Sequence, residues 1–143
     1  MRLLSHPVHP LVVAFPIALL ALTPLWDGAA FFGIEPGLAL VGYWTELAGL
    51  IGGGAALVTG IADFLGLENP SPELTKAALS HAGVAFGTLS VFVLAFVLRG
   101  GSSGEPRGLV LGLEVLGALC LVATGWLGAH LVFRHGAGVK LPH

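Results

Sequence analysis

Four long apolar stretches constrain most strongly what this chain can fold into. The hydrocarbon core of a bilayer is about 30 Å thick, so a helix that rises about 1.5 Å per residue needs about 20 apolar residues to cross it. Four stretches reach that length, and we expect helices at about residues 8–27, 37–67, 72–98 and 108–133. The sequence therefore predicts an all-α, integral membrane four-helix bundle that forms a single domain over residues 1–143.

The composition agrees with a protein embedded in a membrane. Of the 143 residues, 55% are hydrophobic and only 10% are charged, and the mean hydropathy is +0.92. A soluble globule could not hide so much apolar surface from water, so the lipid bilayer is the expected partner. The net charge of -2 gives no electrostatic basis for binding nucleic acid. Cys120 is the one cysteine, and no C-x-x-C-H motif for covalently attached haem is present.

Prolines and small residues mark the expected helix features. Pro10 and Pro72 suit a first helical turn, where a missing N–H costs no hydrogen bond. Pro16 and Pro24 should bend the first helix, which neighbouring helices tolerate. The second stretch carries a stripe of small and weakly polar residues that should face other helices: Thr45, Gly49, Gly52, Ala56, Thr59, Gly60 and Asp63. We expect the N-terminal segment to be retained rather than cleaved, and the sequence predicts no internal repeat.

Positive charges set the expected orientation. With four spans, both termini and the loop between the second and third helices lie on one side of the membrane. That side carries four Lys or Arg residues and the other side two: Arg2, Lys76, Arg134 and Lys140 against Arg99 and Arg107. By the positive-inside rule we expect both termini in the cytoplasm, and a multi-pass protein of the cell inner (cytoplasmic) membrane.

This topology gathers all six histidines on the side of the termini. Each helix then contributes one ligand-capable side chain at a similar depth: His9, Asp63, His81 and His130. Ionisable groups inside a membrane are costly and usually face a functional interior. The open alternative is that each residue lies at the lipid headgroups or bonds a neighbouring backbone.

Haem b is the preferred cofactor for this constellation. Two neutral imidazoles on different helices can bind a haem iron from opposite sides. His81 and His130 are the expected pair because one short loop joins their helices, and His9 would replace one of them or serve a second haem. Small residues near His81, including Ala85, leave room for the macrocycle. Trp126 lies one turn from His130 and could pack on the porphyrin, although an interfacial anchor is an equal alternative.

Direct metal binding is a second hypothesis for the same residues. His9, His81 and His130 with Asp63 would suit zinc, copper or non-haem iron, although no fixed ligand spacing supports this. Asp63 could instead orient a ligating imidazole through its ring N–H.

Proton or ion transport is a third hypothesis. Glu46 and Glu114 would continue a proton path in the other half of the bilayer, and a salt bridge of either one to Arg99 is the favoured alternative. No G-x-S-x-G, Walker or G-x-G-x-x-G motif is present. We therefore expect an electron-transfer or binding protein more than a hydrolytic enzyme.

Three stretches carry a resemblance to a known family. They are HPVHPLVVAFPIAL at 6–19, GIADF at 60–64 together with His81, and GWLGAHLVFRHGAGV at 125–139. Together they resemble the bacterial membrane family catalogued as domain of unknown function 2231, over nearly the whole chain. The resemblance implies a four-helix membrane module that is sometimes fused to Rieske iron-sulfur domains, and hence electron transfer with a redox partner protein. A homo-oligomer is left open.

Overall fold

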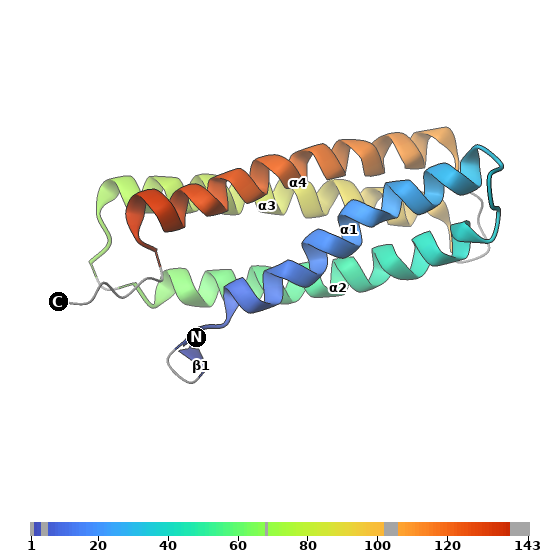
Figure 1. Cartoon of the computed structure of the whole chain (residues 1–143). Coiled ribbons are helices and arrows are strands. Elements are labelled where there is room, and N and C mark those ends of the chain that lie inside the picture. Colours follow the sequence, from blue (N-terminus) through green and yellow to red (C-terminus); the bar gives the residue numbers. More distant parts are fainter. Residues whose placement is uncertain (1, 4–5, 68, 102–105, 138–143) are drawn as a thin grey trace.

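The computed structural model describes residues 2–3, 6–67, 69–101 and 106–137 as a bundle of antiparallel helices (Figure 1). The helices are α1 (His9–Phe31), α2 (Leu38–Leu65), α3 (Pro72–Arg99) and α4 (Gly108–His135). Two short antiparallel strands, β1 (Arg2–Leu3) and β2 (His6–Pro7), precede α1. All four helices are long and apolar enough to cross a membrane, which confirms the expected all-α membrane bundle.

Local sequence explains where the helices begin and end. The Ser71 hydroxyl accepts a hydrogen bond from the Leu74 N–H at 3.1 Å, and Pro72 follows as the first residue of α3. Gly100 and Gly136 end α3 and α4 in the left-handed conformation that glycine adopts without strain. Helix α1 continues to Phe31, one turn beyond the end near residue 27 that the sequence predicts.

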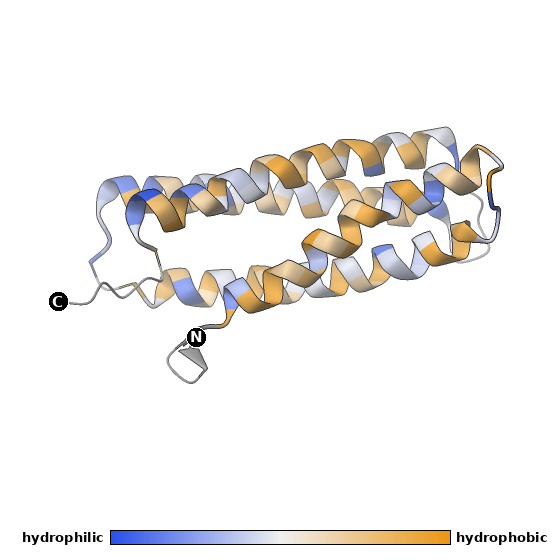
Figure 2. Cartoon of the chain, viewed as in Figure 1, coloured by the Kyte–Doolittle hydropathy of each residue, from blue (hydrophilic) through white to orange (hydrophobic). Residues whose placement is uncertain are grey.

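The bundle consists of two helical hairpins. Helix α1 packs mainly against α2, and α3 packs mainly against α4, whereas α1 with α4 and α2 with α3 make smaller contacts. The helices therefore occupy the corners of a square, with α1 diagonal to α3 and α2 diagonal to α4. Apolar residues cover much of the outer surface along the helices (Figure 2). Such a surface suits lipid contact.

The packed core occupies only part of the bundle's length. Buried residues lie within 16–27 of α1, 42–56 of α2, 88–99 of α3 and 110–124 of α4. In the remaining part of each helix, toward the start of α1 and the end of α4, every described residue is half-buried or exposed. The ribbons of α1 and α4 diverge toward that end (Figure 1). The buried residues thus lie in the part of the bundle that holds the end of α1 and the start of α4, and they do not extend to its other end.

The two hairpins repeat one buried pattern, contrary to the sequence-based expectation of no repeat. Every buried residue of α1 has a buried counterpart 72 positions later on α3: Pro16 with Thr88, Leu20 with Phe92, Thr23 with Ala95, and Asp27 with Arg99. Four of the five buried residues of α2, all but Gly53, recur 68 positions later on α4: Gly42 with Val110, Glu46 with Glu114, Gly49 with Gly117, and Ala56 with Thr124. An approximate twofold axis along the bundle produces this correspondence.

A layer of large apolar side chains against glycines fills the middle of the bundle. A Cβ added to Gly49 would lie 2.7 Å from Leu20 Cδ2, and one added to Gly117 would lie 2.6 Å from Phe92 Cε2. The absence of a side chain lets Leu20 and Phe92 lie directly on the neighbouring helix backbone. Gly49, on the predicted stripe of small residues, therefore faces another helix, as the sequence indicates.

Candidate functional site

His9 lies against the backbone of α2, toward the end of the bundle that the buried residues do not reach. Its Nδ1 is 2.9 Å from the carbonyl oxygen of Ala56 and 3.3 Å from the Thr59 hydroxyl oxygen. A Cβ on Gly60 would lie 3.1 Å from His9 Cε1, so the glycine makes room for the ring. A carbonyl oxygen can only accept, so Nδ1 carries the proton and donates it to Ala56. The lone pair of the neutral ring is then on Nε2.

His81 repeats this arrangement in the second hairpin. Its Nδ1 lies 3.1 Å from the carbonyl oxygen of Thr124 and donates to it by the same reasoning. A Cβ on Gly128 would lie 3.2 Å from His81 Cε1. Thr124 and Gly128 stand 68 positions after Ala56 and Gly60, the same offset as the buried residues of α2 and α4. The two imidazoles are therefore equivalent by position, partner and tautomer.

The two tethered histidines, His9 and His81, come from diagonal helices. Both are half-buried. Within the described part of the chain, neither Nε2 atom makes a hydrogen bond. Two unused imidazole lone pairs are thus present in the section of the bundle that has no packed core.

His130 lies elsewhere on α4. Its ring contacts that of His135, with centroids 5.4 Å apart. His130 comes two positions after Gly128, the residue that His81 overlies, and two positions turn a helix by about 200°. His130 therefore points away from the face of α4 that meets His81.

The other expected site residues occupy varied surroundings. Trp126 is 76% exposed on the outer surface, as suits an interfacial anchor. Ala85 is half-buried one turn after His81, and Asp63 is half-buried one turn after Thr59. Among the residues that the structure describes, no three His, Cys, Asp or Glu side chains are grouped to hold a metal ion. The described geometry thus gives the direct metal hypothesis no support.

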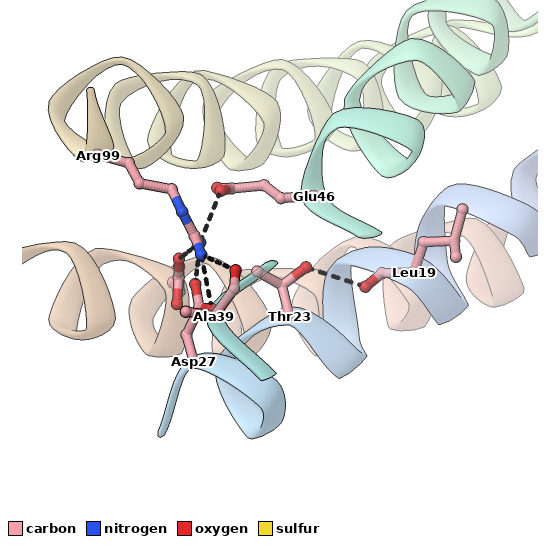
Figure 3. A network of polar contacts seen from close by, with 7 residues as sticks. Leu19, Thr23, Asp27, Ala39, Glu46 and Arg99 are labelled. Atoms are coloured by element: carbon pink, nitrogen blue, oxygen red, sulfur yellow. Dashed lines mark hydrogen bonds and ion pairs between the residues drawn. The ribbon is translucent and has the colours of Figure 1, made fainter. Parts of the chain in front are cut away.

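A cluster of charged side chains occupies the opposite end of the bundle, where the buried residues lie (Figure 3). The Arg99 guanidinium donates to both carboxylate oxygens of Asp27, with Nη2 at 2.9 Å from Oδ1, and Nη2 also donates to the carbonyl oxygen of Ala39. Arg99 Nη1 lies 3.9 Å from Glu46 Oε2 and 3.7 Å from Glu114 Oε1. The side chains of the four charged residues are 0% exposed. One guanidinium therefore joins all four helices.

Smaller contacts complete the surroundings of the cluster. The Tyr43 ring centroid lies 5.8 Å from Arg99 Cζ, within the range of a cation–π contact. A Cβ on Gly42 would collide with the Asp27 carboxylate, so this glycine makes room for the acid. The sequence predicts a salt bridge of Arg99 to Glu46 or Glu114, and both carboxyl groups lie within reach of the guanidinium, at 3.9 and 3.7 Å.

Sequence reasoning missed Asp27, the strongest partner of Arg99. Asp27 stands at the expected end of the first helix, where a solvated carboxylate is ordinary. A signal is nevertheless present, because the interval from His9 to Asp27 is the same as the interval from His81 to Arg99. At about 1.5 Å per residue this interval corresponds to about 27 Å, which puts the histidines and the charged cluster in opposite halves of a bilayer.

Comparisons with known proteins agree with the fold. No curated protein and no solved structure matches the chain. The model of the family described as "Predicted membrane protein (DUF2231)" matches residues 5–141. Because the match covers nearly the whole chain, including both tethered histidines and the charged cluster, this protein belongs to the DUF2231 family of membrane proteins.

Proposed function

We propose that the protein is a membrane b-type haem protein that transfers electrons, with the haem iron ligated by Nε2 of His9 and of His81. The observation that carries this proposal is the equivalence of the two imidazoles. Each is held through Nδ1 by a backbone carbonyl of the neighbouring helix, 2.9 Å away for His9 and 3.1 Å for His81. Such a bond fixes the tautomer and ring orientation that metal ligation requires.

The packing supports a large flat ligand at this position. Ala56 and Thr124, the partners of His9 and His81, are the last buried residues toward this end, and the described residues beyond them are half-buried or exposed. Gly60 and Gly128 let both rings lie close to the backbones of the neighbouring helices. Sites built from facing helices of a four-helix bundle are a common arrangement for cofactors.

The two imidazoles proposed as haem ligands favour electron transfer over a reaction on a bound substrate. His9 and His81 would hold the haem through two imidazoles, and the haem would then supply electron transfer rather than substrate chemistry. His130 is the alternative partner of His81, but it contacts His135 and lies on another face of α4. Trp126, being exposed, would anchor the helix at the membrane surface rather than cover the porphyrin.

The charge bias of the loops supports a location and a partner. It would put the termini and the histidine end of the bundle on the cytoplasmic side of an inner membrane. The haem would then lie in the cytoplasmic leaflet, within reach of a redox partner protein at that surface.

Haem content in purified variants tests the ligand pair. The protein is expressed with ample haem, purified in detergent, and assayed for haem per chain by the pyridine haemochrome method. We expect bound haem in the wild type, its loss in His9→Ala and His81→Ala, and its retention in His130→Ala. Helical circular dichroism identifies any variant that fails to fold.

Two results would overturn the assignment. Haem retained in both His9→Ala and His81→Ala would exclude these residues as ligands. Haem lost in His130→Ala but kept in His9→Ala would restore His130 as the partner of His81. If no variant and no wild-type sample binds haem, elemental analysis for zinc, copper and iron tests the metal hypothesis on the same samples.

A further inference from the structure

We propose that Glu46 and Glu114 form a proton-binding site, in which both side chains are neutral acids beside the Asp27–Arg99 ion pair. This site lies at the opposite end of the bundle from His9 and His81, and it does not depend on haem binding. Its ligand is the proton, taken up and released at the membrane surface nearest the site.

The charge count of the cluster is the first argument. Three carboxyl groups, from Asp27, Glu46 and Glu114, meet one guanidinium, and all four side chains are 0% exposed. The hydrogen bonds that Arg99 makes go to Asp27 and to the Ala39 carbonyl, and none goes to a glutamate. If all three acids were ionised, the buried cluster would carry two uncompensated negative charges, which a low-dielectric interior strongly opposes.

The lack of hydrogen bonds to the two glutamates is the second argument. All four carboxyl oxygens of Glu46 and Glu114 are buried and make no hydrogen bond within the described part of the chain. Arg99 Nη1 lies 3.9 Å from Glu46 Oε2 and 3.7 Å from Glu114 Oε1, too far for a hydrogen bond. A buried carboxylate normally gathers several donors, and neither glutamate does so here. Two bound protons would remove the excess charge without any further protein ligand.

A metal cation is a poorer candidate for the same site. Within the described residues the three acids are not grouped as metal ligands. The guanidinium of Arg99 also stands beside all three carboxyl groups and would repel a cation there. Tyr43 also lies against the cluster, with its ring facing Arg99. Protons need neither a cavity nor a coordination shell, so they fit these surroundings.

The position of the cluster indicates from which side protons arrive. Arg99 is the last residue of α3, and Asp27 lies one turn before the end of α1. Toward the histidine end, Leu20 and Phe92 are 1% and 0% exposed and close the bundle with apolar side chains. The site therefore lies nearer the surface at the α1–α2 loop than the opposite surface, and the apolar layer separates it from the histidines.

Infrared spectroscopy of the protein in lipid tests the proposal. A neutral acid has a C=O stretch that a carboxylate lacks, and this band shifts in D₂O when its proton exchanges. At about pH 7, well above the ordinary Glu pKa of about 4.3, we expect such a band in the wild type. Glu46→Gln and Glu114→Gln should each remove about half of it, and the double variant nearly all. Glu73→Gln, at an exposed position in the first turn of α3, is the matched control and should change nothing.

Two outcomes would overturn the proposal. A wild-type spectrum without a neutral-acid band at pH 7 would show that both glutamates are ionised, and it requires no variant to fold. A band that persists unchanged in the folded double variant would assign the proton to another group. Haem content is measured in the same samples, so that failure here and failure of haem binding are recorded separately.

Discussion

Asp27 and Arg99 occupy equivalent positions of the two hairpins and bond to each other across the bundle. Each follows a tethered histidine at the same sequence interval, and each is fully buried on the inner face of its helix. The two hairpins therefore differ at this equivalent position, because one has an acid there and the other has a base. Because α1 is diagonal to α3, this one bond ties the first hairpin to the second where direct packing between hairpins is limited.

Because Asp27 and Arg99 occupy equivalent positions, exchanging the two residues should largely preserve the stability of the bundle. Asp27→Asn or Arg99→Gln leaves a buried charge without its partner and should lower the free energy of unfolding by about 3–5 kcal/mol. The exchange Asp27→Arg with Arg99→Asp places the guanidinium at the equivalent position, near the same two glutamates, and should recover more than half of that loss. Denaturation by SDS in mixed micelles measures all three. An exchange variant no more stable than the single variants would contradict the twofold relation.

Glycines beneath large side chains should not tolerate a methyl group. Gly117→Ala would put Cβ 2.6 Å from Phe92 Cε2, so we expect a loss of about 1–3 kcal/mol in unfolding free energy. At Gly112, in the same helix, an added Cβ would meet no atom within 4 Å. Gly112→Ala should be neutral or stabilise by up to about 1 kcal/mol, because alanine forms helices better. Equal effects of the two substitutions in the same denaturation assay would refute the close packing at Gly117.

The glycines beside the histidines should control haem binding without changing the fold. A Cβ on Gly128 would lie 3.2 Å from His81 Cε1 and would displace the ring, whereas a Cβ on Gly125 would meet no atom within 4 Å. We therefore expect Gly128→Ala to bind haem more weakly than Gly125→Ala in a spectroscopic titration, with equal helical content. Identical haem affinities would argue against His81 as a ligand held in this position.

The apolar layer formed by Leu20 and Phe92 should prevent protons from passing through the bundle. Leu20 and Phe92 separate the charged cluster from the histidines, so wild-type protein in vesicles should hold a pH gradient as long as lipid alone does. Phe92→Ser should speed the decay measured by an internal pH dye. Phe133→Ser, at a residue that is 88% exposed, is the control and should leave the decay unchanged. Rapid decay with wild-type protein would favour the transport hypothesis instead.

The fold is accessible from sequence because its signals are strong and local. Apolar length identifies four spans, and Ser71 with Pro72 marks the start of α3. The helix end predicted near Asp27 is wrong because Gly28 to Phe31 are apolar or small and simply continue the helix. The expected closeness of Arg99 to Glu46 and Glu114 is confirmed, because a buried guanidinium has few other polar groups to approach.

The repeat is difficult to recognise in the sequence because few positions of the two hairpins carry identical residues. The proposed pairing of His9 with His81 is difficult to recognise for the same reason. The first helices of the two hairpins align at an offset of 72 positions and the second helices at 68, so one fixed period does not align both. Few identical residues mark the repeat, among them His9 with His81 and Glu46 with Glu114. The short loop between α3 and α4 favours His130 as the partner of His81, but the helix turn after Gly128 directs the His130 ring elsewhere. A short connecting loop indicates which helix is the neighbour of α3, but it does not indicate which face of that helix carries His130.

The visible spectrum of the detergent-purified protein, oxidised and then reduced with dithionite, tests the central claim most directly when the wild type is compared with His9→Ala. We predict a low-spin spectrum in the wild type, with a Soret band that shifts and sharpens and resolved α and β bands on reduction. In His9→Ala any haem still bound should be high-spin, because one axial imidazole is missing. A wild-type spectrum without haem bands, or a low-spin spectrum unchanged in His9→Ala, would contradict ligation by His9 and His81.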